Sequence, residues 1–188
     1  MLKRHHKKIV TLIGALAPIF VSAQSLTESI DLYVFDEAKT EYYSICKAVK
    51  KDGQFITASH CLKESLYFKN NNSYDKLPQT KYVGKYSDEY FTGDDLALFG
   101  SKTLEKHSCG AMIHQLDSMR TCPVMEVDDV YVSLDCVLPR GYSGQGFLNA
   151  DGQLCSIYAG YYDLKSGNDT LKVAIFNKIT LKDNNNNE

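Results

Sequence analysis

Short runs of β-forming residues, each ended by turn residues, follow one another along most of this 188-residue chain. Residues 29–35 alternate between apolar and polar with a period of two, and Lys51-Asp52-Gly53 has the composition of a hairpin turn. The sequence has no long amphipathic helical pattern. Strands at short intervals, separated by turn residues, are typical of a β-barrel or a β-sandwich. We therefore predict an all-β fold.

The predicted strands form two groups of six, one on each side of a connector at residues 101–108. The first group lies near residues 29–35, 42–49, 55–58, 66–68, 81–86 and 96–99, and the second near residues 109–115, 120–126, 130–138, 145–150, 153–161 and 171–176. A chain of this length can build two small closed lobes. We expect an N-terminal β-barrel over residues 24–100, a C-terminal β-barrel over residues 101–181, and a disordered Asn-rich tail over residues 182–188.

Residues 1–23 have the features of a secretory signal peptide. A basic start precedes an apolar segment at residues 9–21 that is short for a bilayer span, and Val21-Ser22-Ala23 ends it with small residues. We expect cleavage before Gln24 and a secreted or periplasmic product. The alternative, a retained membrane anchor, is disfavoured because Gly14 and Pro18 shorten the apolar segment further.

The charge of the expected mature chain bears on its partners. Cleavage removes four of the 21 Lys and Arg residues and none of the 23 Asp and Glu residues. The net charge is then about −6 with neutral histidines. This balance argues against nucleic acid or an anionic membrane as a partner.

All six cysteines lie in the part of the chain that we expect to be exported: Cys46, Cys61, Cys109, Cys122, Cys136 and Cys155. An even number of cysteines in an oxidising compartment predicts three disulfides, whose connectivity the spacing alone leaves open. A zinc site made of His107, Cys109, His114 and Cys122 is the alternative. Its spacing matches no familiar zinc motif, so we expect neither a metal nor another cofactor.

Three side chains suited to nucleophilic catalysis occur in the order His, Asp, Ser. His60 follows an apolar run, and a buried strand would hold it as rigidly as a general base requires. Asp95 directly precedes Leu96-Ala97-Leu98, so its partly desolvated carboxylate could hold one imidazole tautomer. Asp94 is the alternative for this role, and a purely structural histidine is the alternative for His60.

Ser143 lies in the glycine-rich stretch Gly141-Tyr142-Ser143-Gly144-Gln145-Gly146. Small residues allow a tight bend there, which could direct the Gly141 and Ser143 N–H groups into one small space. Two such donors stabilise the oxyanion of a tetrahedral intermediate. Gly and Ser also fill ordinary hairpin turns, so this stretch indicates a nucleophile only together with its partners.

The three motifs together resemble those of the chymotrypsin-like (trypsin-like) serine proteases. Thr57-Ala58-Ser59-His60-Cys61 resembles their Thr-Ala-Ala-His-Cys, Asp95-Leu96-Ala97-Leu98 resembles their Asp-Ile-Ala-Leu, and Gly141-Tyr142-Ser143-Gly144 resembles their Gly-Asp-Ser-Gly. The resemblance implies a compact bacterial-type member with two six-stranded antiparallel β-barrels and the active site between them.

Residue roles follow from this resemblance. It implies that Ser143 is the nucleophile, that His60 is the general base and then the acid, and that Asp95 orients His60. The oxyanion hole would be formed by the Gly141 and Ser143 amides. The resemblance also implies a Cys46–Cys61 disulfide beside the histidine. The remaining pairs, by proximity, would be Cys136 with Cys155 and Cys109 with Cys122.

The sequence departs from the family pattern around the nucleophile. Tyr142 replaces the family's Asp, and the chain has no Ile-Val-Gly-Gly start, so we expect no activation by a freed N-terminus. We expect competence once the chain is exported and oxidised. Gln145-Gly146 replaces the usual Gly-Pro. The sequence separation between Asp95 and Ser143 is shorter than in digestive proteases of the family, which implies shorter loops in the second barrel.

The expected substrate cleft follows from the same resemblance. Val137 falls at the pocket base, where no Asp is present to attract Lys or Arg. The expected strand for the substrate backbone is Ser156-Ile157-Tyr158-Ala159-Gly160-Tyr161, with Tyr158, Ala159, Gly160 and Tyr161 lining the cleft. These residues indicate a preference for apolar or small side chains.

The sequence therefore predicts an exported serine endopeptidase, a monomer that cleaves a protein or peptide substrate through an acyl-enzyme on Ser143. The alternative from another class is a catalytically silent or latent protease-fold module that binds a partner or acts on a host. An esterase on the same fold is a third possibility.

Overall fold

A computed structural model of the chain describes residues 27–63, 65–84, 94–100 and 105–179. The expected signal peptide, the expected tail and part of the predicted strand at residues 81–86 lie outside these ranges. In the described residues there are fourteen strands and one short 3-10 turn, η1 (Ser59–Cys61). None of the described helical segments is long and apolar enough to cross a bilayer.

The first sheet is antiparallel and is formed by residues between Thr27 and Phe99. Its seven strands have the order β5-β4-β1-β2-β3-β7-β6. They are β1 (Thr27–Asp36), β2 (Glu41–Lys51), β3 (Gln54–Thr57), β4 (Tyr67–Asn70), β5 (Ser73–Lys76), β6 (Thr80–Val83) and β7 (Ala97–Phe99). The turn between β2 and β3 has positive φ angles at Asp52 and Gly53, as a two-residue hairpin loop with an Asp-Gly sequence requires.

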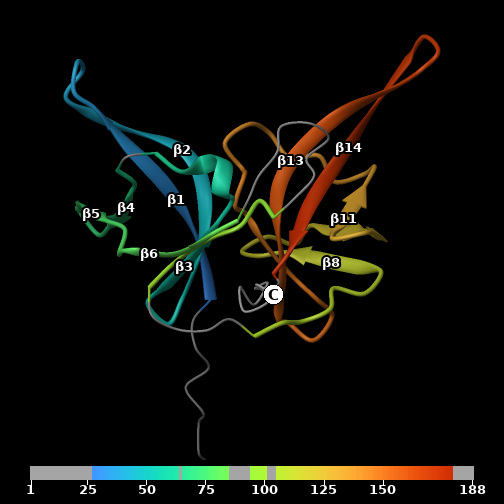
Figure 1. Ribbon diagram of the computed structural model, residues 1–188, viewed down its shortest axis with the longest axis horizontal. Helices are drawn as coiled ribbons and strands as arrows, with labels where there is room; N and C mark the ends of the chain where they lie inside the picture. Colours follow the sequence, from blue (N-terminus) through green and yellow to red (C-terminus); the bar gives the residue numbers. More distant parts are fainter. Residues whose placement is uncertain (1–26, 64, 85–93, 101–104, 180–188) are drawn as a thin grey trace, which may run out of the picture.

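The second sheet is also antiparallel and has the order β10-β11-β14-β13-β12-β8-β9. Its strands are β8 (Met112–Gln115), β9 (Thr121–Pro123), β10 (Met125–Val127), β11 (Val130–Ser133), β12 (Gly146–Leu148), β13 (Leu154–Ser166) and β14 (Asp169–Lys178). The two sheets curl against each other, and the long β1–β2 and β13–β14 hairpins diverge from the body of the molecule on one side (Figure 1).

The all-β, two-sheet prediction is confirmed, with seven strands in each sheet instead of six. In the first sheet the additional strand is β5, whose polar sequence Ser-Tyr-Asp-Lys has no apolar period. In the second sheet the run predicted at residues 120–126 divides at Val124 into β9, which pairs with β8, and β10, which pairs with β11. The domain boundary predicted after residue 100 falls beside residues 101–104, which are not described, and stays a prediction.

Two clusters of buried apolar residues stabilise the fold. The first contains the cores of β2, β3 and β7 but also Leu116, Leu154, Ile157 and Ile179 from the second half of the chain. The second lies within the other sheet, around Phe147 and Phe176, whose rings contact each other edge to face at 4.8 Å. Each fully buried Leu, Ile or Phe contributes roughly 1.5 to 3 kcal/mol. Because the first cluster spans both sheets, its packing fixes one sheet relative to the other.

Candidate active site

His60 lies in the short η1 turn at the end of β3. The strand residues Gln54 to Thr57 are all buried, so the chain enters the turn from a fixed position. The next residue, Cys61, is bonded to Cys46 of β2, as the resemblance implied. The histidine backbone is therefore held from both sides, while its ring remains partly exposed.

Asp95 is a buried carboxylate that accepts three hydrogen bonds. Its side chain is 2% exposed. Oδ2 lies 2.7 Å from His60 Nδ1, and Oδ1 accepts from the His60 N–H at 2.9 Å and from Ser59 Oγ at 2.8 Å. Asn177 of β14 donates to the Asp95 main-chain oxygen at 2.9 Å. These donors offset the cost of burying a charge, and the Nδ1 contact leaves Nε2 as the ring nitrogen that can accept a proton.

Asp94, the alternative to Asp95, has a different partner. Its carboxylate accepts a hydrogen bond from the Tyr82 hydroxyl. Burial, together with this hydrogen bond, raises the pKa of Tyr82 to about 12. The geometry thus places the Asp95 carboxylate against His60 Nδ1, while that of Asp94 bonds to Tyr82.

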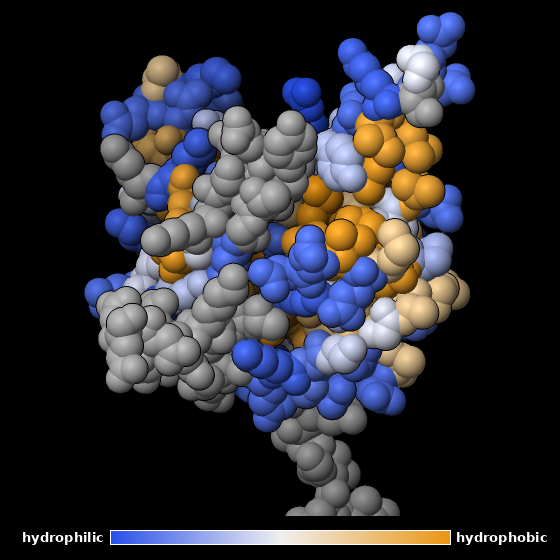
Figure 2. All heavy atoms as spheres, turned by 45° about the vertical axis from the view of Figure 1, so that its right-hand side comes forward, coloured by the Kyte–Doolittle hydropathy of each residue, from blue (hydrophilic) through white to orange (hydrophobic). Residues whose placement is uncertain are grey.

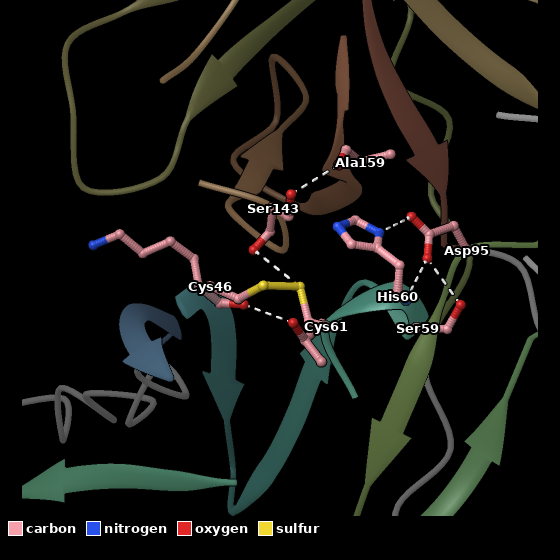
Figure 3. The surroundings of a disulfide bond; sticks show 9 residues. Cys46, Ser59, His60, Cys61, Asp95, Ser143 and Ala159 are labelled. Atoms are coloured by element: carbon pink, nitrogen blue, oxygen red, sulfur yellow. Dashed lines mark hydrogen bonds and ion pairs between the residues drawn. A yellow bond between two sulfur atoms is a disulfide. The ribbon is translucent and has the colours of Figure 1, made fainter. Parts of the chain in front are cut away.

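Ser143 lies opposite His60 in a loop of the second sheet, and the three residues approach one another from different elements (Figure 3). The loop is joined to β2, because the Ser143 oxygen accepts from the Lys47 N–H at 2.7 Å. Gly144 has a φ of +89°, and a Cβ on it would lie 2.0 Å from the Lys47 oxygen. Only glycine fits this close approach between the two halves of the chain.

The Ser143 hydroxyl donates to the main-chain oxygen of Ala159 at 2.9 Å. A hydroxyl carries one proton, so in this arrangement the proton is directed at β13 and not at His60. In Figure 3 one ring nitrogen of His60 contacts Asp95 and the other faces the Ser143 side. Rotation about the Ser143 Cα–Cβ bond is the change that would bring the hydroxyl proton toward Nε2.

The two predicted oxyanion donors lie in the same loop. The Tyr142 N–H donates to the Pro139 oxygen at 3.3 Å, and Gly141, the third residue of that turn, has a φ of +88°. A positive φ at this position is typical of a type II turn. Within the described part of the chain, neither the Gly141 N–H nor the Ser143 N–H donates to another protein group. Both donors are therefore available to a ligand.

A cavity of about 380 Å³ adjoins His60 and Ser143. Its lining residues are His60, Leu138, Pro139, Arg140, Ser143, Tyr158, Ala159, Gly160, Tyr161 and Asp163. The residues predicted from β13 are all in this lining, but Val137 is not, and it packs instead beside the second core cluster. The sequence analysis missed Arg140 and Asp163. Arg140 adjoins the nucleophile motif, and Asp163 is two residues beyond Tyr161 on the same strand, so both could have been found by extending those two segments.

The roles of Gln145 and Lys47, two further residues near Ser143, were not predicted from the sequence. Gln145 is 2% exposed; its side chain accepts from Ser29 Oγ at 3.0 Å and donates to the Leu116 oxygen at 3.0 Å. Lys47 Nζ lies 2.6 Å from Asp31 Oδ1. Through its bond to Ser29, Gln145 connects β1 to the loop at residues 141–145 that carries Ser143, called the nucleophile loop below.

The disulfide prediction is partly wrong. Cys46–Cys61 is present, but the other two bonds are Cys109–Cys155 and Cys122–Cys136. Proximity along the chain was a poor guide, because Cys109 lies three residues before β8 and Cys155 near the start of β13, two strands that flank β12 in the sheet. Cys109 and Cys122, which the zinc alternative required as ligands, are both engaged in these bonds.

A histidine and a buried aspartate on one curled antiparallel sheet face a serine on a second one. The fold is chymotrypsin-like. A variant of the HtrA-type protease AlgW, solved with a decapeptide, matches 79% of this chain at 13% identity, with a TM-score of 0.43. This chain spans 58% of the length of that protein.

The MamO protease domain from Magnetospirillum magneticum, in its apo form, matches 78% of this chain and 89% of its own length, at 13% identity and a TM-score of 0.38. No family model matches the sequence, and no curated protein matches it either.

Proposed function

We propose that this chymotrypsin-like chain is an exported serine endopeptidase that cleaves peptide bonds through an acyl-enzyme on Ser143. The observation that carries the proposal is the buried Asp95, which contacts His60 Nδ1 at 2.7 Å while the ring faces Ser143. A carboxylate in this position fixes the tautomer that accepts a proton on Nε2 and stabilises the imidazolium that forms. The three disulfides support export to an oxidising compartment.

The proposed reaction proceeds in two stages. Ser143 Oγ attacks the substrate carbonyl carbon while its proton passes to His60 Nε2, and the oxyanion accepts hydrogen bonds from the Gly141 and Ser143 N–H groups. The carbon–nitrogen bond then breaks, and His60 returns the proton to the leaving amine. In the second stage a water molecule gives a proton to His60 and its oxygen attacks the acyl carbon. The ester bond then breaks, the acid is released, and His60 returns the proton to Ser143 Oγ.

Covalent labelling of the oxidised mature chain with a fluorophosphonate tests this proposal. We expect one label per chain, on Ser143, with Ser143→Ala and His60→Ala both abolishing it. The Ser143 substitution removes the nucleophile, and the His60 substitution removes its base. Absence of labelling on folded protein with intact disulfides would contradict the proposal.

The hydrogen bond from Ser143 Oγ to the Ala159 oxygen favours the second candidate, a latent protease-fold module. In that case the hydroxyl remains on β13 and the cleft binds a peptide without cleaving it. Mass spectrometry of an unmodified peptide incubated with the chain separates the two candidates: cleavage supports the endopeptidase, and retention of intact bound peptide supports the module. Turnover of ester but not amide substrates would instead indicate an esterase.

A further inference from the structure

Tyr158 is a large side chain buried beneath the cavity beside Ser143. It is 1% exposed, and its ring contacts Phe176 edge to face with the centroids 5.5 Å apart. The hydroxyl accepts from the Leu138 N–H at 3.1 Å and donates to the Leu138 oxygen at 3.2 Å. Burial raises the pKa of Tyr158, which keeps the hydroxyl protonated and able to make both bonds. The phenol is therefore fixed at both ends.

The position of this ring matters because of what lies on either side of it. One wall of the cavity is the segment from Leu138 to Arg140, which leads into the nucleophile loop, and the other is β13 from Tyr158 to Tyr161. A peptide whose carbonyl faces Ser143 must direct the side chain of that residue between these two walls. Tyr158 extends from one wall to the other and ends on the Leu138 main chain. It therefore forms the floor of the space that this side chain would enter.

From this arrangement we infer that Tyr158 determines specificity: it makes the primary pocket shallow, so that the residue on the acyl side of the cleaved bond must be glycine, alanine or serine. This inference rests on the proposed function. A larger side chain would have to displace a ring that has two hydrogen bonds and a core contact, and overpacking of a filled site is unfavourable. Val137, predicted at the pocket base, does not line the cavity.

The test uses peptide diphenyl phosphonates, which react covalently with the active-site serine of serine proteases. The side chain next to phosphorus enters the primary pocket, and we compare probes with alanine or phenylalanine at that position. Wild type should react with the alanine probe about 100-fold faster than with the phenylalanine probe. Tyr158→Val, which shortens the side chain and opens the floor, should bring the two rates within about tenfold. Tyr158→Phe keeps the ring and removes only the hydroxyl, so it should retain the wild-type preference.

A side-chain-free fluorophosphonate, run in parallel, separates this inference from the proposed function. If wild type reacts with it but takes the phenylalanine and alanine probes equally well, the role of Tyr158 is overturned while the endopeptidase proposal stands. If folded wild type does not react with it at all, the endopeptidase proposal fails and the specificity inference fails with it. If Tyr158→Val does not fold, as shown by loss of its thermal transition, the wild-type and Tyr158→Phe preferences decide the matter.

Discussion

Ser143 Oγ donates its hydrogen bond to the main-chain oxygen of Ala159, at 2.9 Å, in a cleft where His60 is already oriented by Asp95. The Ala159 oxygen lies on β13, the strand against which a substrate backbone is proposed to pair. Beyond Ile157 the residues of β13 pair only with β14 among the described strands, so one edge can accept a further strand. A substrate N–H that bonds to Ala159 would compete with Ser143 and turn its hydroxyl toward His60.

If the proposed activity holds, this competition predicts that catalysis depends strongly on one substrate N–H group. N-methylation of the residue that contributes the cleaved carbonyl should lower kcat/KM by more than about tenfold, which exceeds the effect of most single neutral hydrogen bonds. Methylation of the preceding residue is the matched control, since successive N–H groups of an extended chain point to opposite edges. Steady-state kinetics on the three peptides checks this. Equal losses for both methylated peptides would show that Ser143 release is not coupled to substrate binding.

Asp95 and Asp94 offer a second test because they are neighbours with different partners. Asp95→Asn should lower kcat by about 10³-fold or more, because an amide nitrogen can face Nδ1 and favour the wrong imidazole tautomer. Asp94→Asn should leave kcat within about threefold of wild type, since the Asp94 carboxylate bonds to Tyr82 and it is Asp95 that contacts His60 Nδ1. Peptide turnover by the two folded variants measures both effects. A comparable loss in the Asp94 variant would contradict the assignment.

The short strands were sufficient to predict two antiparallel sheets, and the three motifs named His60, Asp95 and Ser143, which the structure places around one cleft. Their catalytic roles stay a prediction. Each of those side chains is placed by a local signal, such as the apolar run before His60 or the glycines around Ser143. For the pocket, the sequence assigns the base to Val137, which does not line the cavity, and predicts Tyr158 only as one of the residues along the cleft. The β13–β14 register is irregular between Tyr158 and Gly160, and a bulge changes the direction in which the side chains after it point. A sequence period does not reveal such a shift.

The close approach at Gly144 predicts a large loss of stability on substitution. Gly144→Ala would place a Cβ 2.0 Å from the Lys47 oxygen at a φ of +89°, so the nucleophile loop must separate from β2. Gly152→Ala is the matched control, because Gly152 has a φ of +75° but no atom within 4 Å of its virtual Cβ. The control should cost about 1 to 2 kcal/mol from backbone strain alone. Gly144→Ala should cost at least about 2 kcal/mol more, measured by urea unfolding. Similar losses in the two variants would refute the steric argument.

The disulfides separate stability from catalysis. Cys46–Cys61 and Cys122–Cys136 close loops with sequence separations of 15 and 14, so replacing either pair by alanine should lower the unfolding free energy by a similar amount, about 3 kcal/mol. Only the first pair includes the neighbour of His60, and the Ser143 oxygen lies 3.9 Å from Cys61 Sγ. Loss of Cys46–Cys61 should therefore slow fluorophosphonate labelling of Ser143 at least about tenfold. Loss of Cys122–Cys136 should change the labelling rate less than about threefold. Both rates are compared at a temperature where both variants are folded. Parallel thermal melts establish that temperature, and equal labelling rates would mean that the first disulfide does not position His60.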